Sequence, residues 1–486
     1  MADRPHILIF NPDHYRGDVL GHVGNPTAIT PNLDRMVEAD GVSFAGTFCQ
    51  SPVCTPSRCS FMSGWYPHVH GHRTMHHMLR PQEPVLLRTL KENGYFVWWG
   101  GKNDLVPAQH GFDGICDVKY RPKRDVRVRD DTASRGEPGS DTFYSFFLGE
   151  LEVPDGETVF FDNDWANVAG AIDLIRDPPT DRPLCIYLAL QYPHPPYAVE
   201  EPWFSMIDRG KVPPRIPTPD TWERKPSIER GLYRNYNMSS WSEARWNELR
   251  AVAYGMCARV DHQFGLVVDA LEEAGLYDET AILFFSDHGD WLGDYGLVDI
   301  NQNTFEDSLT RVPLIIKPPN DIPVSPGVRD ALVELIDVPA TIEDFAAIEP
   351  AQTHFGRSLR PLIEGKATGH RDAVFCEGGR LEGETHCMEL ESPNGQHEGD
   401  HYWPRLSLQK RIPEHTKAVM CRTRTHKYVR RLYETDELYD LTADPQELHN
   451  RIGDPSMAGV LADLKDRLLS FFLECGDVVP HDPDRR

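Results

Sequence analysis

The stretch Ala281-Ile-Leu-Phe-Phe-Ser286, followed at once by Asp287-His288, decides the fold that we expect for this chain of 486 residues. The run is continuously apolar rather than alternating, which is typical of a strand that is covered on both faces. Residues 6–10 have the same character. Strands of this kind occur in a mostly parallel sheet that lies between two layers of helices.

Further apolar runs and helical patterns alternate along most of the chain. We predict strands at residues 42–49, 96–100, 184–190 and 312–316, and helices near residues 32–39, 87–93, 165–175 and 243–274. This order predicts an α/β fold with a mostly parallel central sheet.

The pattern changes beyond about residue 370. Short predicted strands at residues 373–377, 417–422 and 427–431 precede an amphipathic helix at residues 457–472. We therefore expect a catalytic domain at residues 1–370. A smaller C-terminal α+β subdomain, with short antiparallel strands and a helix, would follow at residues 371–486.

Composition excludes several classes of partner. The formal net charge is −25, which argues against nucleic acid and against an acidic membrane surface. No run of 18 apolar residues is present, so we predict no membrane span. The ten cysteines are scattered without framework spacing, and the N-terminal residues lack the layout of a signal peptide. We therefore expect a cytoplasmic protein with reduced thiols.

Metal-compatible side chains follow three of the predicted strands. Asp13 comes two residues after the first strand, and Asp287 and His288 directly follow the strand quoted above. Cys54 follows the strand at residues 42–49 by a short loop. Because ligands bind beyond the carboxyl ends of parallel strands, these groups are expected to converge. Taken singly, either aspartate is better explained as a surface turn residue; together with Cys54 they favour a site for a hard divalent cation.

The segment Cys54-Thr-Pro-Ser-Arg58 has the features of a reactive site. Pro56 has a fixed φ and no N–H group, so it suits the first turn of a helix that begins near Cys54. The free N–H groups at that end favour negative charge and are expected to lower the pKa of a nucleophile. A structural cysteine before a helix is the alternative interpretation.

Several motifs in the same order along nearly the whole chain carry a family resemblance. They are Ile7-Leu-Ile-Phe-x-x-Asp13 with Asp18, Thr30-Pro-Asn-Leu-Asp34, Cys54-Thr-Pro-Ser-Arg58, Gly101-Lys102, Pro193-His194-Pro-Pro-Tyr197, Phe285-Ser-Asp287-His288-Gly289-Asp290, Arg311-Val-Pro-Leu-Ile315 and Glu437-Leu-Tyr-Asp-Leu-Thr-Ala-Asp-Pro445. With these motifs the chain resembles the sulfatase family of the alkaline-phosphatase superfamily.

The resemblance implies an alkaline-phosphatase-like fold and a sulfuric ester hydrolase. It implies that Cys54 is oxidised to formylglycine by a formylglycine-generating enzyme. A divalent metal would be held by Asp13, Asp287, His288 and the modified residue itself. Ca²⁺ is the first choice, with Mn²⁺ and Mg²⁺ as alternatives, because His288 as a ligand shifts the preference toward Mn²⁺.

The resemblance also implies groups that contact the substrate. Arg58, Lys102 and His194 would contact the anion, and His194 is the first candidate for the general acid that protonates the departing alcohol. The pair His76-His77 offers other candidates, or is simply a pair of surface histidines.

The chain departs from the family pattern at three places. His14 stands where a second aspartate is common, and Asp104 stands where the usual Gly-Lys-x-His motif has histidine. A lysine expected about 13 residues after the Asp-His pair is missing, and Asn301 or Asn303 is a substitute donor. We therefore place Asp104 and Asn301 among the candidate substrate-binding residues.

Three alternatives remain. A phosphodiesterase or phosphonate monoester hydrolase would use the same fold, metal and nucleophile, but such relatives tend to lack the lysine at position 102. A phosphosugar mutase would need Ser or Thr where Cys54 stands, and a purely binding role would need an unmodified thiol.

The identity of the alcohol is open. Segments 200–242 and 380–411 are expected to set specificity, the first as a long loop; the second carries His386, His397, His401, Tyr402 and Trp403. Aromatic and polar groups together suit a small aryl or a carbohydrate sulfate ester. The sequence does not decide between a monomer and a homo-oligomer.

Overall fold

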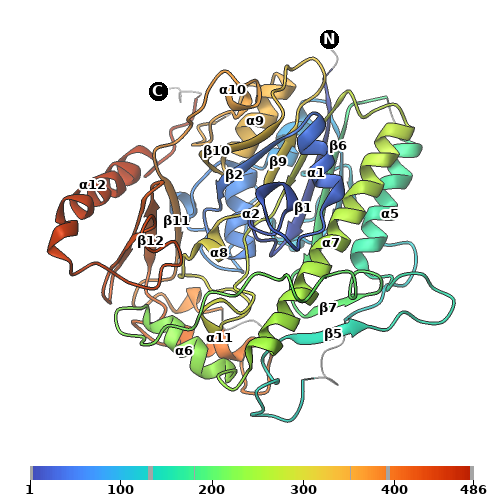
Figure 1. Cartoon of the computed structure of the whole chain (residues 1–486). Helices are drawn as coiled ribbons and strands as arrows, with labels where there is room; N and C mark the ends of the chain where they lie inside the picture. The colour runs from blue at the N-terminus through green and yellow to red at the C-terminus, as the bar shows by residue number, and fades with distance from the viewer. Residues whose placement is uncertain (1–3, 130–134, 180, 351, 390–394, 482–486) are drawn as a thin grey trace.

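The computed structural model describes residues 4–129, 135–179, 181–350, 352–389 and 395–481, and its centre is an eight-stranded sheet (Figure 1). The strands are β1 His6–Asp13, β2 Val42–Phe48, β3 Phe96–Gly101, β4 Val118–Lys119, β6 Leu184–Pro193, β8 Thr280–Phe285, β9 Leu314–Lys317 and β10 Gly327–Glu334. They stand in the order β10-β2-β9-β8-β1-β6-β3-β4. Only β9 runs antiparallel to its neighbours, so the prediction of a mostly parallel sheet is confirmed.

Helices cover both faces of the sheet. One face carries α1 Pro31–Ala39, α5 Asn163–Arg176 and α7 Glu243–Glu273, and the other carries α2 Cys54–Ser63, α4 Leu86–Glu92, α9 Asp337–Ala346 and α10 Arg360–Ile363. The short helix α3 Pro67–His70 packs against the C-terminal part of the chain instead. Leu8 and Phe10 of β1 pack toward the α7 side, whereas Ile7 and Ile9 pack toward the α2 side. Burial on both faces explains why these strands are continuously apolar.

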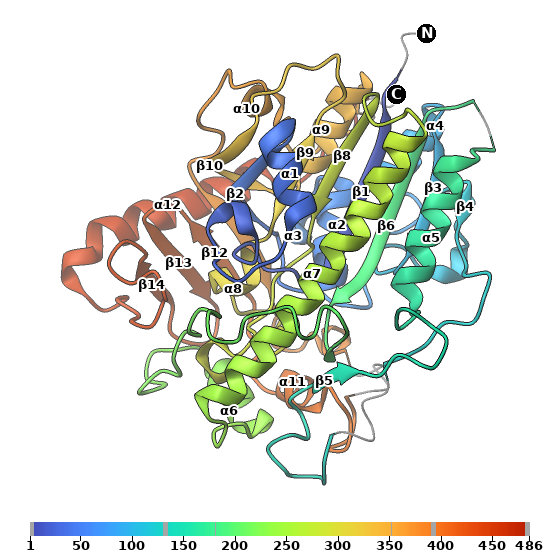
Figure 2. The ribbon, with the colours of Figure 1, turned by 45° about the vertical axis from the view of Figure 1, so that its right-hand side comes forward.

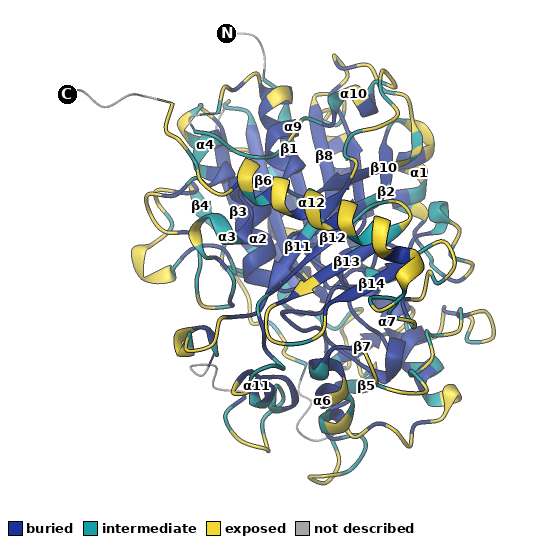
Figure 3. Ribbon diagram, turned by 90° about the vertical axis from the view of Figure 1, so that its left-hand side faces the viewer, coloured by how far each residue is buried: buried dark blue, intermediate teal, exposed yellow. Residues whose placement is uncertain are grey.

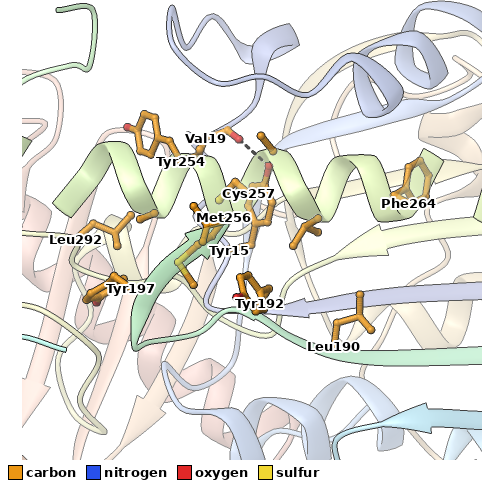
Figure 4. Packing of buried hydrophobic residues seen from close by; sticks show 14 of the residues in the cluster. Tyr15, Val19, Leu190, Tyr192, Tyr197, Tyr254, Met256, Cys257, Phe264 and Leu292 are labelled. Atoms are coloured by element: carbon orange, nitrogen blue, oxygen red, sulfur yellow. Dashed lines mark hydrogen bonds between the residues drawn. The ribbon is translucent and has the colours of Figure 1, made fainter. Parts of the chain in front are cut away.

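The longest helix, α7, has a clear local signal at its N-terminal end. The Ser242 side chain accepts a hydrogen bond from the backbone N–H of Arg245 at 3.3 Å, which caps the first turn. The loop after β1 packs on this helix: the Tyr15 hydroxyl donates to the Val19 carbonyl oxygen at 3.0 Å beside Cys257 (Figure 4). The helix thereby fixes the segment that follows Asp13.

A second sheet forms the C-terminal part. It is antiparallel, with β11 Val374–Gly378, β12 Ala418–Arg422, β13 His426–Arg431 and β14 Glu437–Asp440. Helix α12, Ala458–Glu474, covers one face and leaves its own outer side exposed (Figure 3). The other face joins the main core through Cys376 and Met420. The boundary predicted at residue 370 falls between α10 and β11.

A group of elements at the carboxyl end of the main sheet forms what we call the cap. It consists of the parallel pair β5 Phe147–Leu151 and β7 Tyr197–Glu200 together with α6 Ser227–Tyr236 and α11 Trp403–Gln409. Strand β6 points toward these elements (Figure 2). A Cβ atom on Gly231 of α6 would lie 2.9 Å from the Leu408 side chain, so glycine permits the close contact with α11.

The prediction that segment 200–242 is a long loop is wrong in its central part, which forms α6. Ile228, Leu232 and Tyr236 are buried at a spacing of four residues, which is a helical period. The Pro- and Trp-rich flanks hide this short pattern in the sequence. Part of the second specificity segment, residues 390–394, lies outside the described residues.

Two further observations concern the state of the cysteines and the length of the helices. All ten cysteines are free and buried, as expected for a chain without a disulfide framework. In the described part of the chain, no helix combines the length and apolar character that crossing a membrane requires.

Candidate active site

The ends of β1 and β8 and the start of α2 meet in one buried cluster. Asp13 is the last residue of β1, His288 follows β8, and Cys54 is the first residue of α2. With His14 they offer four ligand atoms that all lie within 4.8 Å of one another, and all four residues are buried. The convergence predicted for Asp13, Cys54 and His288 is therefore present.

The contacts around the cysteine are short. Its Sγ lies 3.1 Å from His288 Nε2 and 3.5 Å from Asp13 Oδ1. The Nε2 atom of His288 lies 3.5 Å from the same Asp13 oxygen. A carboxylate, two imidazoles and residue 54 thus face a common point.

Outer contacts orient the two imidazole rings. His288 Nδ1 lies 2.9 Å from the Gly289 carbonyl oxygen, and His14 Nδ1 lies 2.8 Å from Asp290 Oδ2. Each Nδ1 therefore carries the proton, and each Nε2 presents a lone pair to the cluster. The Nε2 atom of His14 is buried and has no hydrogen-bond partner among the residues that the structure describes. Such an orphaned acceptor fits a metal ligand, so these residues suit a divalent cation.

His14 pays a conformational cost for this position. Its φ is +67°, in the left-handed region that L residues rarely adopt. Strain of this kind persists where surrounding contacts fix it, and here Asp290 holds the ring. Burial, then the neighbouring His288, lowers the pKa of His14 well below its usual range, which keeps the imidazole neutral.

Arg58 lies beneath the cluster and is fully buried. Its Nε donates to Asp287 Oδ2 at 2.8 Å, and its Nη1 donates to Asn11 Oδ1 at 2.9 Å and to the Tyr187 hydroxyl at 3.2 Å. Nη2 lies 3.6 Å from Asp13 Oδ2. The guanidinium therefore positions the two aspartates.

Asp287 is adjacent to the cluster without being one of its four members. Its Oδ2 accepts from Arg58, and its Oδ1 accepts from the His288 backbone N–H at 3.0 Å. Burial raises the pKa of this carboxyl, and Arg58 offsets part of the effect. The role of Asp287 as a metal ligand stays a prediction.

Lys102 reaches the cluster from the end of β3. Its ammonium pairs with Asp13 and with Asp104, the latter at 2.8 Å, and lies 3.6 Å from Cys54 Sγ. Gly101 makes this turn feasible, because its φ is +86° and a Cβ there would lie 2.0 Å from the Ala189 carbonyl oxygen. Burial opposes the charge on Lys102, but Asp104 and Asp13 outweigh it and hold its pKa well above its usual range.

Asp13 is ionised in spite of its burial. Burial alone would raise the pKa of this carboxyl, but Lys102 and Arg58 outweigh it and hold the pKa well below its usual range. The group therefore presents a charged ligand.

His194 lies against His14, with ring centroids 4.3 Å apart. Its Nδ1 lies 2.5 Å from the Pro195 carbonyl oxygen. Burial, then His14, lowers its pKa well below the usual range, so the ring is neutral near pH 7. Its service as general acid stays a prediction. Of the other candidates, His76 is exposed and His77 Nδ1 lies 2.5 Å from Thr74 Oγ1.

The two asparagines proposed as substitutes for a missing lysine are buried. Asn301 Nδ2 donates to Asn303 Oδ1 at 2.7 Å, and Asn303 donates to the Glu414 and Thr416 carbonyl oxygens at 3.0 Å. Within the described part of the chain, Asn301 Oδ1 has no hydrogen-bond partner. Contact of Asn301 or Asp104 with a substrate stays a prediction.

One electrostatic expectation is wrong. The pKa of the Cys54 thiol is raised well above its usual range, first by burial and then by Asp13, although Lys102 opposes the shift. Burial and a neighbouring carboxylate outweigh the partial positive charge of the α2 N-terminus.

Sequence reasoning missed three contributors. His14 was noted only as a departure from a family pattern, yet a histidine beside Asp13 at the end of a strand is a metal-ligand signal in its own right. Asn11 and Asp290, which hold Arg58 and His14, carry no sequence signal of their role, because each acts through a residue distant in the chain.

Fold and site together define a metal-dependent hydrolase with an alkaline-phosphatase-like architecture. The sulfatase family model matches residues 5–348, which is more than half of the chain. The chain therefore belongs to the sulfatase family, and the enzyme is a sulfatase that hydrolyses sulfate esters.

Known proteins extend this similarity over almost the full length. The chain is 25% identical to the multifunctional alkaline phosphatase superfamily protein PehA of Trinickia caryophylli, over 98% of this chain and 96% of that protein. It is 27% identical to an arylsulfatase of Clostridium perfringens, over 77% and 81%. The crystal structure of a phosphonate monoester hydrolase of Agrobacterium radiobacter superposes with a TM-score of 0.74 at 24% identity, covering 99% of this chain and all of that one. This last likeness shows the shared fold.

Proposed function

We propose that residue 54 acts as formylglycine and that the enzyme cleaves a sulfate monoester with a divalent metal at Asp13, His14 and His288. The observation that carries the proposal is the place of Cys54. It begins α2 and lies 3.1 Å from His288 and 3.5 Å from Asp13, where an oxygen nucleophile would stand within reach of a metal. An aldehyde there adds water to give a diol, one hydroxyl of which attacks sulfur while the other later expels sulfate.

The surrounding residues of the chain have distinct tasks. Lys102 offsets charge that builds on the sulfuryl oxygens, because its ammonium is already fixed 3.6 Å from residue 54. Arg58 holds Asp287 and Asp13 in place rather than reaching the ester itself. His194 faces the same cluster through His14. It is our first choice for the proton donor to the departing alcohol, on the condition that the bound sulfate anion raises its pKa and lets the neutral ring take up a proton first.

The ligand set bears on the choice of metal. When bound, the cation supplies Lewis-acid activation of the nucleophile and of the sulfuryl group. Asp13 supplies a hard oxygen, but His14 and His288 supply two imidazole nitrogens. Ca²⁺ prefers an all-oxygen site, whereas Mn²⁺ accepts imidazole readily. This set moves our expectation from Ca²⁺ toward Mn²⁺.

The alcohol part of the substrate is expected to contact the cap. Phe146 and Tyr402 lie with ring centroids 5.7 Å apart, and Tyr144 stacks on Trp403. This aromatic wall suits an aryl or sugar sulfate. Maturation would require a formylglycine-generating enzyme as a transient partner.

A phosphate diester or phosphonate monoester is the second candidate substrate, because a relative of nearly equal length is described as a multifunctional superfamily protein. Parallel kinetics on an aryl sulfate and an aryl phosphate diester separate the two. We expect the larger kcat/KM for the sulfate. A larger kcat/KM for the diester would contradict the proposal.

A further inference from the structure

A basic cavity lies apart from the metal-ligand cluster. Its volume is about 580 Å³, within the range of roughly 300–1,000 Å³ that small-molecule sites occupy. Its wall comes from the loop after β1, from α7, from α8 (Asp307–Thr310) and from the end of β12. Five arginines and three aspartates supply the ionisable groups; they are Arg16, Arg250, Arg311, Arg422, Arg424, Asp18, Asp294 and Asp307.

The aspartates of this cavity are already paired. Arg16 binds Asp18 at 2.7 Å and Asp294 at 2.7 Å, and Arg250 adds a contact of 3.2 Å to Asp294. Each carboxylate charge is thereby balanced before any ligand arrives.

Two cationic side chains pair with the carboxylate of Asp307. Arg422 binds it through two nitrogens, at 3.0 and 2.7 Å, and Lys427 adds a contact of 2.8 Å. Burial opposes its ionisation, but Lys427 and Arg422 outweigh it and hold its pKa well below the usual range.

Two arginines are left without an ion pair among the described residues. Arg311 is half-buried and Arg424 is exposed, and both line the cavity. Arg311 acts on Asp18 and Asp307 only at longer range. The cavity therefore carries a local excess of positive charge, although the net charge of the whole chain is −25.

We propose that this cavity is a second anion-binding site, separate from the catalytic cluster, which takes a tetrahedral oxyanion group such as sulfate or phosphate on Arg311 and Arg424. The guanidinium fork matches two oxygens of such a group, and Arg is favoured wherever oxyanions are recognised bidentately. The site also accounts for motif residues that the catalytic chemistry leaves unused, namely Asp18, Arg311 and Pro445.

The bound oxyanion group can belong to a free inorganic ion or to a larger molecule, such as a polysulfated saccharide, that carries it as a substituent. Thermal unfolding at constant ionic strength distinguishes them, with inorganic phosphate in one arm and a disulfated disaccharide in the other. Each ligand is added at about ten times its dissociation constant, where linkage predicts a rise in Tm of about 2 °C. Every protein in the test carries Lys102→Ala and is stripped of metal, which weakens anion binding at the metal-ligand cluster.

On that background we expect Arg424→Glu and Arg311→Gln to lose the rise in Tm. Arg35→Glu is the matched control, because Arg35 is an exposed arginine on α1, 58% accessible, outside the cavity. It should keep the rise. Arg424 is exposed, so its variant tests the site even if Arg311→Gln fails to fold.

A rise with phosphate assigns the site to a free ion, and a rise with the disaccharide alone assigns it to a substituent. No rise in either arm, or a rise that Arg424→Glu retains, would overturn the inference. Turnover is not measured, so the result stands or falls independently of the proposed sulfate ester hydrolysis.

Discussion

The metal-ligand cluster and the cap differ in the elements that position their side chains. Asp13, His288 and Lys102 each lie at or just beyond the end of a strand of one sheet, so the sheet itself sets their distances. The cap combines β5 and β7 with helices α6 and α11, which come from segments 200–242 and 380–411 and pack against each other. The central sheet thus positions the reactive groups, whereas the expected substrate contacts lie on connecting segments, which tolerate sequence change more readily.

A substitution at the centre of the cluster should have the largest effect. Cys54→Ala removes the nucleophile but no large core side chain, so we expect sulfatase turnover to be abolished with little change in Tm. Cys54→Ser should retain little activity, because serine lacks the second hydroxyl that expels sulfate. Cys59→Ala, in the same helix, is the control and should keep turnover. Wild-type turnover by the serine variant would refute the diol chemistry.

Metal binding is the next test of the cluster. His14→Ala should lower the affinity for the metal more than Asp290→Asn does. The histidine is the expected ligand, whereas Asp290 only orients its ring through the contact of 2.8 Å between Asp290 Oδ2 and His14 Nδ1. Loss of such an orienting partner typically costs about 10–100-fold in metal affinity. Calorimetric titration of stripped protein with Mn²⁺ and Ca²⁺ measures both variants, and His76→Ala, an exposed position, is the control. Unchanged affinity in His14→Ala would remove it from the metal site.

Lys102 tests the choice of substrate within the cluster. Removing one preorganised donor costs on the order of 3 kcal/mol, roughly a hundredfold in rate, so Lys102→Ala should lower sulfatase kcat/KM by that factor. Hydrolysis of a phosphate diester should fall less, because one of its oxygens is esterified. Lys123→Ala is the control, since that side chain is 78% exposed. Both activities staying within about twofold of wild type would mark Lys102 as a surface group.

We expect the smallest effect from a substitution of Arg405, which ties the cap to the loop at Asp299. Arg405 of α11 lies 3.3 Å from Asp299 Oδ2, on the loop that follows Asp287 and His288. Breaking a buried ion pair usually costs about 3–5 kcal/mol. Burial, partly offset by Arg405, raises the pKa of Asp299 to about 7, so the freed carboxyl can take up a proton. We therefore expect Arg405→Met to lower the free energy of unfolding by only about 1–3 kcal/mol.

Adding Asp299→Asn to Arg405→Met should recover part of that loss, because the double variant leaves no unpaired charge. Chemical denaturation of the single and double variants gives the coupling energy. Strictly additive losses would show that Arg405 does not anchor the cap through Asp299.

The contrast between the two regions also explains what the sequence predicted. The central sheet and the convergence of Asp13, Cys54 and His288 follow from apolar runs and from the rule that parallel strands end at one edge. Helix α6 was missed because Ile228, Leu232 and Tyr236 form a stripe too short to stand out among prolines, and its partner α11 lies far along the chain. The raised pKa of Cys54 depends on burial, which local sequence does not report.

Some predictions stay as such. The cytoplasmic location and the division of the chain at residue 370 rest on sequence patterns alone. The identity of the alcohol depends on contacts between two cap segments, which no single motif encodes.

The most direct test of the account is the mass of the peptide that contains residue 54, taken from protein made together with a formylglycine-generating enzyme. Conversion oxidises the Cys54 Cβ to an aldehyde carbon: –CH2SH becomes –CHO, so the peptide loses one sulfur and two hydrogen atoms and gains one oxygen. We predict that the specific activity toward an aryl sulfate rises in proportion to the converted fraction of this peptide. Full activity in protein whose residue 54 is entirely unmodified cysteine would contradict the central claim.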